Sequence, residues 1–461
     1  MKKERFSKKM ISRREFLRGI GLGATGLYLS GCVVAPAPSQ APAAAPKEEE
    51  GPKEFSWKMA EGQEVAYLGL KSGPEDFWQE LVPEFEELTG IATKFEAFEQ
   101  AQARQKLATE FTAGTTNIDT FRTVRGQDFA QYSKNGWYEA LDPYINDPAM
   151  VAPDFDLGDF FEGALNACTL DGTIIALPVL NGGQCMFVRR DLLDEKGLEI
   201  PTNFDELEAA AKALHNPPDV YGFVSRGQKS SAVSMFAAFL HNMGADWMGA
   251  DGKTPSLNTP EAIAAYEFYG GLLRDYAPPG INNMANIELV PFFQQGQAAM
   301  YPDDVLFRNL FEDEESSKVV GNVAYAHFPA GPARDTPTIY VYGVAVSSQS
   351  DNKLPAWLWT QYLASKDVQI RGMARGIAAG RKSAWDDPEA LATAPEDWIE
   401  TCKWTFETGD DHWAPPVISV PEARDIVGTP ITVAIEGGDV KAACERANEE
   451  LAALAKRDGV I

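Results

Sequence analysis

Short apolar runs alternate with amphipathic stretches along the chain from residue 64 onward. The runs are predicted strands because they are brief and bounded by polar residues or glycine, whereas apolar positions three and four apart in the intervening stretches predict helices. The predicted strands cover residues 64–70, 92–97 and 118–123, and the predicted helices begin near residues 73, 101 and 126. This alternation predicts a doubly wound α/β lobe with a mostly parallel sheet, which would hold a ligand beyond the carboxyl ends of its strands.

The second half of the chain continues the mixed pattern. Further predicted strands cover residues 173–179, 323–327 and 339–346. A helix is predicted to begin within residues 201–207, where Thr202 or Asn203 can accept hydrogen bonds from first-turn amides. Mainly helical patterns then run to the C-terminus. No period of about 20 to 50 residues recurs, which excludes a repeat architecture.

The first 31 residues have the composition of an export signal. They contain eight basic and two acidic residues, and a glycine-rich stretch without charge follows from residue 19 to residue 35. Arg13 and Arg14 stand side by side before Phe16 and Leu17, which resembles the twin-arginine motif for export of folded proteins. Residues 1–31 are therefore predicted to be a twin-arginine lipoprotein signal peptide.

Cys32 follows Leu29, Ser30 and Gly31, and this order resembles a lipoprotein processing box. The alternative is a buried thiol in a membrane helix. A span needs about 17 residues or more, and this run is short, glycine-rich and followed by proline, so we expect acylation of Cys32 instead. Residues 32–61 begin with an Ala/Pro-rich stretch and are predicted to be a disordered tether. The protein is thus expected outside the cytoplasm, anchored to the cell membrane by lipid.

Length and charge narrow the classes of function. The chain has 461 residues, enough for two to four domains at about 100 to 200 residues each, and two lobes are the simplest expectation. The 41 basic and 67 acidic side chains give a formal net charge of -26, which repels a phosphate backbone. We therefore expect no nucleic-acid partner, and we expect a monomer.

The cysteines and histidines predict no metal centre. Besides Cys32 there are Cys168, Cys185, Cys402 and Cys444, which allow three complete disulfide connectivities among which the sequence does not choose. No Cys-x-x-Cys spacing occurs, and the four histidines are far apart in the sequence, so neither a metal nor a cofactor is expected.

Six segments, in order, resemble one known family. They are residues 172–179, 186–198, 201–207, 293–300, 344–376 and 435–451. Together with the leader they resemble the extracellular solute-binding proteins of ABC importers, in particular the carbohydrate-binding group that includes maltodextrin-binding protein. The resemblance covers roughly residues 62 to 461.

The resemblance implies a periplasmic-binding-protein-like α/β fold, with two doubly wound lobes joined by a multi-segment hinge. Crossings are expected near residues 177–179, 327–329 and 376–380. Lobe one then comprises residues 62–176 and 330–375, and lobe two comprises residues 180–326 and 381–461. The implied function is capture of a small solute, a mono- or oligosaccharide, between lobes that close by hinge motion, with delivery to ABC permease subunits and no catalysis.

Polar side chains in the loops after predicted strands are the first candidates for ligand contact. Arg125 and Gln127 follow a strand of lobe one, Asn181 and Gln184 follow the first crossing, and Arg226 lies in the matching loop of lobe two. Such loops meet at the carboxyl edges of the sheets, where planar polar groups can bind sugar hydroxyls. For each of these residues, the alternative is an ordinary loop position that is exposed to solvent and contacts no ligand.

The aromatic candidates have different origins. Trp247 stands where the resemblance implies an aromatic residue near ligand, Tyr340 and Tyr342 lie on the segment expected to re-enter lobe one, and Trp413 precedes Ala414. Each can stack on the C–H faces of a sugar or can simply pack in the core or at the rim. After residue 300 the family usually has an aromatic platform, whereas this chain has Asp303 and Asp304. This departure puts the stacking interaction at that point in doubt.

Asp303 and Asp304 leave several interpretations open. They can accept sugar hydroxyls, cap the helix expected from residue 305, bind a cationic solute such as a polyamine, or serve as acid and base of a secreted glycoside hydrolase. The capping and hydroxyl-acceptor interpretations are favoured, because neighbouring side chains point apart whereas hydrolase carboxylates face each other across a bond at about 5 to 10 Å. A scaffold lipoprotein that binds no solute is a third class, and it would not close.

Overall fold

The computed structural model describes residues 54–114, 117–392 and 394–461. The predicted signal peptide, Cys32 and residues 32–53 of the predicted tether lie outside the described residues. Among the helices of the described part, none is long and apolar enough to cross a bilayer. The four cysteines within it, Cys168, Cys185, Cys402 and Cys444, are buried and free.

The predicted disordered tether ends earlier than residue 61. Phe55, Trp57 and Met59 are partly buried against a hydrophobic cluster, and Ala60 is fully buried in it. The ring of Trp57 meets Tyr362 edge to face at 6.2 Å between centroids. The expectation of disorder through residue 61 was wrong for residues 54–61, because aromatic side chains just after the Ala/Pro-rich stretch have an apolar surface to cover.

Lobe one is built on three parallel strands, as predicted. They are β1 (Glu64–Leu70), β2 (Ala92–Phe98) and β3 (Thr120–Val124), with β1 between the other two. Successive residues of β1 serve opposite faces of the sheet: Tyr67 packs in the cluster with Trp359, and Leu68 packs in the cluster with Phe111. Because helices cover both faces, the central strand β1 is buried on both sides from Tyr67 to Leu70, whereas the edge strand β2 keeps Lys94 exposed.

The helices of lobe one match the predicted starts closely, with one break. The helix expected from about residue 73 is interrupted at Leu81. The second piece begins at Val82, and Pro83 lies in its first turn, where the missing N–H costs no hydrogen bond. The elements are α1 (Gly73–Glu80), α2 (Val82–Thr89), α3 (Gln100–Ala113), α4 (Ala130–Lys134), α5 (Asp142–Ile145), α13 (Lys353–Leu363) and α14 (Lys366–Met373).

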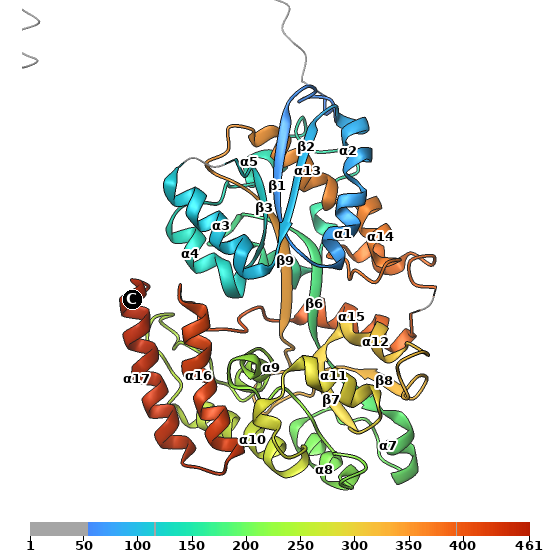
Figure 1. Cartoon of the computed structure of the whole chain (residues 1–461), viewed down its shortest axis with the longest axis vertical. Helices are drawn as coiled ribbons and strands as arrows, with labels where there is room; N and C mark the ends of the chain where they lie inside the picture. Colours follow the sequence, from blue (N-terminus) through green and yellow to red (C-terminus); the bar gives the residue numbers. More distant parts are fainter. Residues whose placement is uncertain (1–53, 115–116, 393) are drawn as a thin grey trace, which may run out of the picture. The chain divides into compact units, whose positions relative to one another are not determined.

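Two long antiparallel strands connect the lobes (Figure 1). They are β6 (Leu177–Arg189) and β9 (Ile339–Val346), and they pair with each other through residues 177–183 of β6. β9 also pairs with β3 of lobe one, while the far half of β6 pairs antiparallel with β7 (Met300–Asp304) and β8 (Val323–Ala326) of lobe two. The apolar runs at 177–179 and 185–189 are thus one continuous strand, and the chain passes between lobes within it.

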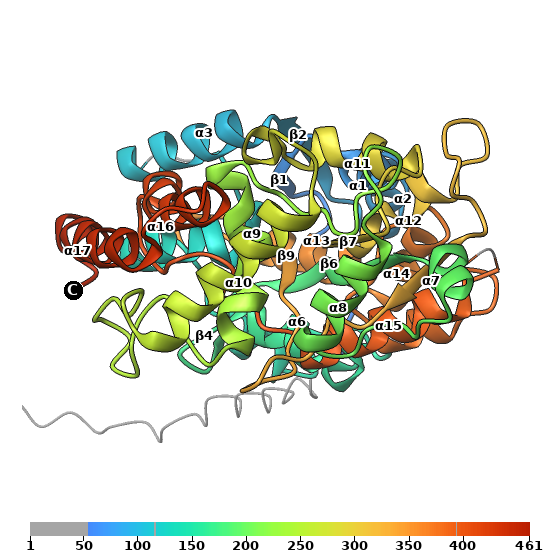
Figure 2. The ribbon, with the colours of Figure 1, turned by 90° about the horizontal axis from the view of Figure 1, so that it is seen from below.

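Lobe two is mainly helical around these strands. In Figures 1 and 2 the long C-terminal helices α16 and α17 lie side by side at its edge. The elements are α7 (Arg190–Lys196), α8 (Phe204–Leu214), α9 (Lys229–Asn242), α10 (Pro260–Tyr276), α11 (Asn286–Gln294), α12 (Arg308–Phe311), α15 (Glu396–Thr408), α16 (Val420–Ile435) and α17 (Val440–Asp458). Three short elements lie near the hinge: α6 (Glu162–Ala167), β4 (Thr169–Leu170) and β5 (Thr173–Ile174).

The second crossing differs from its predicted place at residues 327–329. Residues 330–338, expected in lobe one, still contact lobe two: the Ala330 amide donates to the Thr202 carbonyl at 2.9 Å, and Thr338 bridges to Asp410. The chain crosses within β9 instead. The resemblance implied a crossing before this loop, but the strand that follows it, β9, pairs with β3 of lobe one and with β6 at the hinge and itself makes the crossing.

Candidate functional site

A π-helical turn at the carboxyl end of β3 positions the lobe-one candidates. It covers Arg125–Phe129 and contains both Arg125 and Gln127. Buried Asp128 fixes the turn, because its carboxylate accepts from the Val124 amide at 2.9 Å and from Arg104 Nε at 2.6 Å. The sequence indicated a helix start here but gave no sign of this buried anchor.

A second buried ion pair stands beside it in lobe one. Arg122 Nη1 lies 2.5 Å from the carboxylate of Glu75, and the same nitrogen donates to Ser72 Oγ at 3.0 Å. The Arg122 guanidinium also covers the ring of Tyr342 at 4.3 Å from its centroid. Sequence reasoning missed Arg122 and Glu75, although an arginine inside a predicted buried strand is itself a signal that a buried partner exists.

Lobe two contributes a third pair, between Arg226 and Asp303. Arg226 donates from Nε at 2.9 Å and from Nη2 at 2.5 Å to the two carboxylate oxygens, and Tyr301 Oη donates to the same carboxylate at 2.5 Å. Asp303 is completely buried, whereas the side chain of Arg226 keeps 15% of its surface exposed. Arg226 and Asp303, predicted separately, therefore form one unit.

Asp304 points away from its neighbour toward the hinge strands. Its carboxylate accepts from the Leu306 amide at 3.2 Å, so it does cap the 3-10 turn that follows β7, and it accepts from the Gly183 amide at 3.3 Å. A side chain at Gly182 would collide with it, since a Cβ there would lie 2.7 Å from Oδ2. Burial raises the pKa of Asp304 to about 7, against the lowering effect of the two amides.

Aromatic rings and one further arginine complete the junction. Trp413 lies edge to face with Tyr340 at 5.9 Å, and the Arg424 guanidinium lies 5.3 Å from the Trp413 ring. The Tyr340 hydroxyl donates to the Ser234 carbonyl at 3.1 Å, and burial raises the pKa of Tyr340 well above its usual value. Tyr342, two residues further along β9, has its ring 4.3 Å from the Arg122 guanidinium of lobe one.

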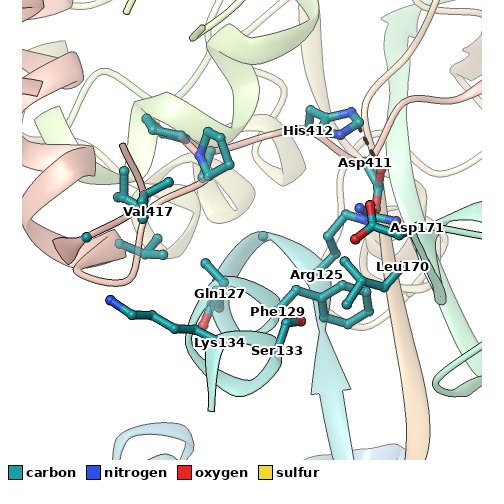
Figure 3. A pocket seen from close by; sticks show the side chains of 18 residues that line it. Arg125, Gln127, Phe129, Ser133, Lys134, Leu170, Asp171, Asp411, His412 and Val417 are labelled. Carbon is teal, nitrogen blue, oxygen red and sulfur yellow. Dashed lines mark ion pairs between the residues drawn. The ribbon is translucent and has the colours of Figure 1, made fainter. Parts of the chain in front are cut away.

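A cavity of about 520 Å³ lies next to this cluster, between the π-helical turn and α4 on one side and the segment before α16 on the other (Figure 3). Arg125 and Gln127 line it, as do residues 414–417 and Lys134. Arg125 links the two walls of the cavity, because the Arg125 Nε lies 2.6 Å from the Asp411 carboxylate on the opposite wall. His412 Nδ1 lies 2.6 Å from Asp410, and that hydrogen bond raises the pKa of His412 to about 9.

Three predicted site residues are more deeply placed than expected. Asn181 donates to the Ala379 carbonyl at 3.2 Å, and Gln184 donates to the Met235 carbonyl at 2.9 Å, both completely buried at the hinge. Trp247 is also fully buried in the core of lobe two, where its Nε1 donates to the His412 carbonyl at 2.7 Å. Trp247 therefore supports the loop that carries Trp413 and does not line the cavity.

The structure thus brings most of the predicted residues to one junction between the lobes. Each of the following predicted residues lies at the junction, where it contacts another of them or shares a contacting residue with one: Arg125, Gln127, Arg226, Asp303, Asp304, Tyr342 and Trp413. The residues that sequence reasoning missed are Glu75, Arg104, Arg122, Asp128, Asp411 and Arg424. Mixed α/β lobes around crossing strands, with polar groups at the junction, define the periplasmic-binding-protein-like fold, which confirms the predicted fold class.

Comparison with known proteins identifies the family. Residues 71–370 match the model of the bacterial extracellular solute-binding protein family, so the chain belongs to that family. It is 26% identical over 426 residues to the erythritol/L-threitol-binding protein of Mycolicibacterium smegmatis, with 87% of each chain covered. It is 25% identical to the mannitol-binding protein of Pseudomonas aeruginosa, covering 73% of this chain and 78% of that one.

A solved structure gives the same result. The solute-binding protein of an ABC transporter from Agrobacterium radiobacter K84, in complex with ribitol, superposes with a TM-score of 0.73 at 27% identity, covering 86% of this chain and 99% of that one. The predicted family, including its carbohydrate-binding group, is confirmed. Members of this family are extracytoplasmic binding proteins of transport systems, not enzymes.

Proposed function

We propose that this protein captures a neutral polyol or small sugar between its two lobes and delivers it to an ABC permease. One observation carries the proposal: four of the five arginines at the junction, Arg104, Arg122, Arg125 and Arg226, each lie against a carboxylate within the protein, and the fifth, Arg424, donates to the Ser230 carbonyl at 2.9 Å. Because four of these cations are already balanced, an anionic ligand has little to gain from them. Paired charges still offer donors and acceptors to hydroxyl groups, and the rings of Tyr342 and Trp413 offer apolar faces.

The relatives support a polyol in particular. The names of two relatives refer to erythritol, L-threitol and mannitol, and a third was solved with ribitol. An acyclic polyol presents a hydroxyl on every carbon and no net charge, which suits a site built from paired charges. The solute of this chain is therefore expected among small polyols and monosaccharides.

The two alternative functions, a glycoside hydrolase and a receptor for a cationic solute, agree less well with the geometry of Asp303 and Asp304. Asp303 is held by Arg226 and Tyr301, and the Asp304 carboxylate points instead toward Gly182 and Gly183, so the two do not face each other as an acid and base pair would. A cationic solute such as a polyamine would have to bind at the Asp304 carboxylate. Burial raises the pKa of this carboxyl to about 7 and so favours its uncharged form. Both features favour a hydroxyl-bearing ligand.

We propose further that Cys32 is acylated and that Arg13 and Arg14 direct export in the folded state. The support is the sequence of the leader. Replacing Cys32 by Ser should release an exported protein without lipid, and replacing both arginines by Lys should leave precursor in the cytoplasm. Normal export of the double-lysine variant would show that the leader is an ordinary secretory signal.

Calorimetry of the purified protein tests the proposed ligand class. Erythritol, ribitol, mannitol and monosaccharides are titrated beside spermidine, an amino acid and inorganic phosphate. We expect tight binding of one neutral, hydroxyl-rich solute. Titration with the charged solutes should produce little heat of binding. If only charged solutes bind, the ligand class is wrong although the family assignment stands. Small-angle scattering with that ligand should show compaction, which a scaffold protein would not show.

A further inference from the structure

The cavity of about 520 Å³ ends at a contact between the lobes. Gly126 lines the cavity, and a Cβ on this residue would lie 2.4 to 2.7 Å from three atoms of the Trp413 indole ring. Real Cβ atoms do not approach other atoms so closely, so the π-helical turn packs against the ring without space between them. A solute that contacts Arg125 and Gln127 therefore has this cavity as its space, and not the packed core behind Trp413.

The volume of this cavity exceeds what a small polyol needs. A molecule of liquid water takes about 30 Å³, so 520 Å³ corresponds to about 17 groups of that size. A five-carbon polyol, counted as one group for each carbon and oxygen, accounts for about ten of them. The remaining space matches one further ring-sized group, and the whole cavity is within the range of about 300 to 1,000 Å³ that holds small-molecule ligands.

The polar and apolar parts of the cavity lie at different ends. Figure 3 shows Asp171 and the Arg125 side chain at one end and Val417 across the cavity from them. The Ser419 amide donates to the Asp458 carboxylate at 2.6 Å, which places the last residues of the chain beside the segment that carries Val417. The apolar lining residues contributed by these two segments are Ala414, Pro415, Pro416, Val417, Val420 and Val460.

The polar end suits a neutral group that carries hydroxyls. Arg125 and His412 each pair with an aspartate, and Lys134 Nζ donates to the Asp458 carbonyl at 2.5 Å, so these cations have partners within the protein. Gln127 is half-buried, and its side-chain amide makes no hydrogen bond to another residue of the described part of the chain. An amide can donate to one sugar hydroxyl and accept from another.

We propose that the solute bound in this cavity is a small sugar that carries an apolar substituent, as in a glycoside with an apolar aglycone. The inference rests on the proposed function and adds a substituent to the solute. The sugar unit contacts Arg125 and Gln127, and the substituent covers the apolar end, where Pro416 and Val460 keep part of their surface exposed. A hydroxyl placed there would lose its water without gaining a partner, whereas an apolar group gains in proportion to the area it covers.

Calorimetry with matched ligands tests the substituent. The purified protein is titrated with glucose, galactose and mannose and with the methyl and phenyl glycosides of each. In one of these series the phenyl glycoside should bind at least about tenfold more tightly than the parent sugar, with the methyl glycoside between them. Phenyl glycosides that bind no more tightly than the parent sugar in every series, or that do not bind at all, would overturn the inference.

Val460→Thr tests the apolar end itself. The Val460 amide donates to the Ala455 carbonyl at 2.9 Å, which fixes the residue, and Thr has nearly the shape of Val with a hydroxyl in place of one methyl group. The substitution should weaken binding of the phenyl glycoside about three- to tenfold and leave the affinity for the parent sugar and the thermal midpoint close to wild type. Val320→Thr is the matched control, because Val320 is a half-buried loop valine outside the cavity lining.

The outcomes separate this inference from the proposed function. If wild type binds a polyol or an unsubstituted sugar and gains nothing from the phenyl group, the substituent is wrong and the proposed function stands. Equal weakening of both ligands by Val460→Thr, or no weakening of either, would likewise overturn the substituent alone. If wild type binds only charged solutes, both are wrong.

Discussion

Arg226→Met should destabilise the protein strongly, because it leaves Asp303 buried without its cation. Asp303 has no exposed surface, and Arg226 reaches it through two hydrogen bonds at 2.9 and 2.5 Å. Breaking a buried pair by removing one partner costs about 3 to 5 kcal/mol. At about 2 to 4 °C per kcal/mol for a lobe of this size, calorimetric unfolding should shift down by about 6 to 20 °C.

Two further variants separate the charge effect from general disruption. Arg226→Met combined with Asp303→Leu removes both charges, so most of the lost stability should return. Arg457→Met removes an arginine from a pair with Glu422 that is more than half exposed, and it should leave the stability nearly unchanged because solvent screens such a pair. If Arg226→Met behaved like Arg457→Met, or if the double variant were less stable than the single one, the argument from burial would be refuted.

The remaining predictions concern pH and the N-terminal segment. The pKa of Asp304 rises to about 7 on folding, so its contribution to the free energy of unfolding is full below about pH 4 and is lost as pH rises through 7. Asp304→Asn should therefore flatten this part of the curve of stability against pH, as measured by urea unfolding. His412 is stabilised in its protonated form by Asp410, so its contribution is full below about pH 6.5 and is lost as pH rises through about 9, and His412→Gln should remove this loss. Trp57→Ala should lower the thermal midpoint, because the ring packs on Tyr362; an unchanged midpoint would show that residues 54–61 add nothing to the fold.

Local patterns were sufficient for the strands and helices of lobe one and for part of the site. Arg125 and Gln127 were expected at the edge of the sheet because a predicted strand ends just before them, and Asp303 was singled out because it stands where the resemblance implies an aromatic platform. The partners of these residues could not be found in this way. Asp411 follows Arg125 by almost three hundred residues, and only the tertiary fold brings the two together.

The misplaced expectations have the same origin. The crossing near residues 327–329 was implied by the resemblance, yet the hydrogen bonds of residues 330–338 hold them to lobe two. Trp247 was predicted near ligand from the resemblance, but its indole N–H donates to a backbone carbonyl in the core. Gly126 has no sequence signal of its own, because its role depends on a tryptophan that approaches from the other lobe.

Native mass spectrometry of freshly purified protein tests the central claim most directly, because a solute held between closed lobes is carried through purification. Ligand released on denaturation is then identified by its mass and by chromatography against standards. The paired charges at the junction predict a neutral polyol or small sugar in one-to-one ratio with the protein, absent from an Arg226→Met and Asp303→Leu variant that folds. Release of an amino acid, a polyamine or a phosphorylated compound instead would contradict the claim.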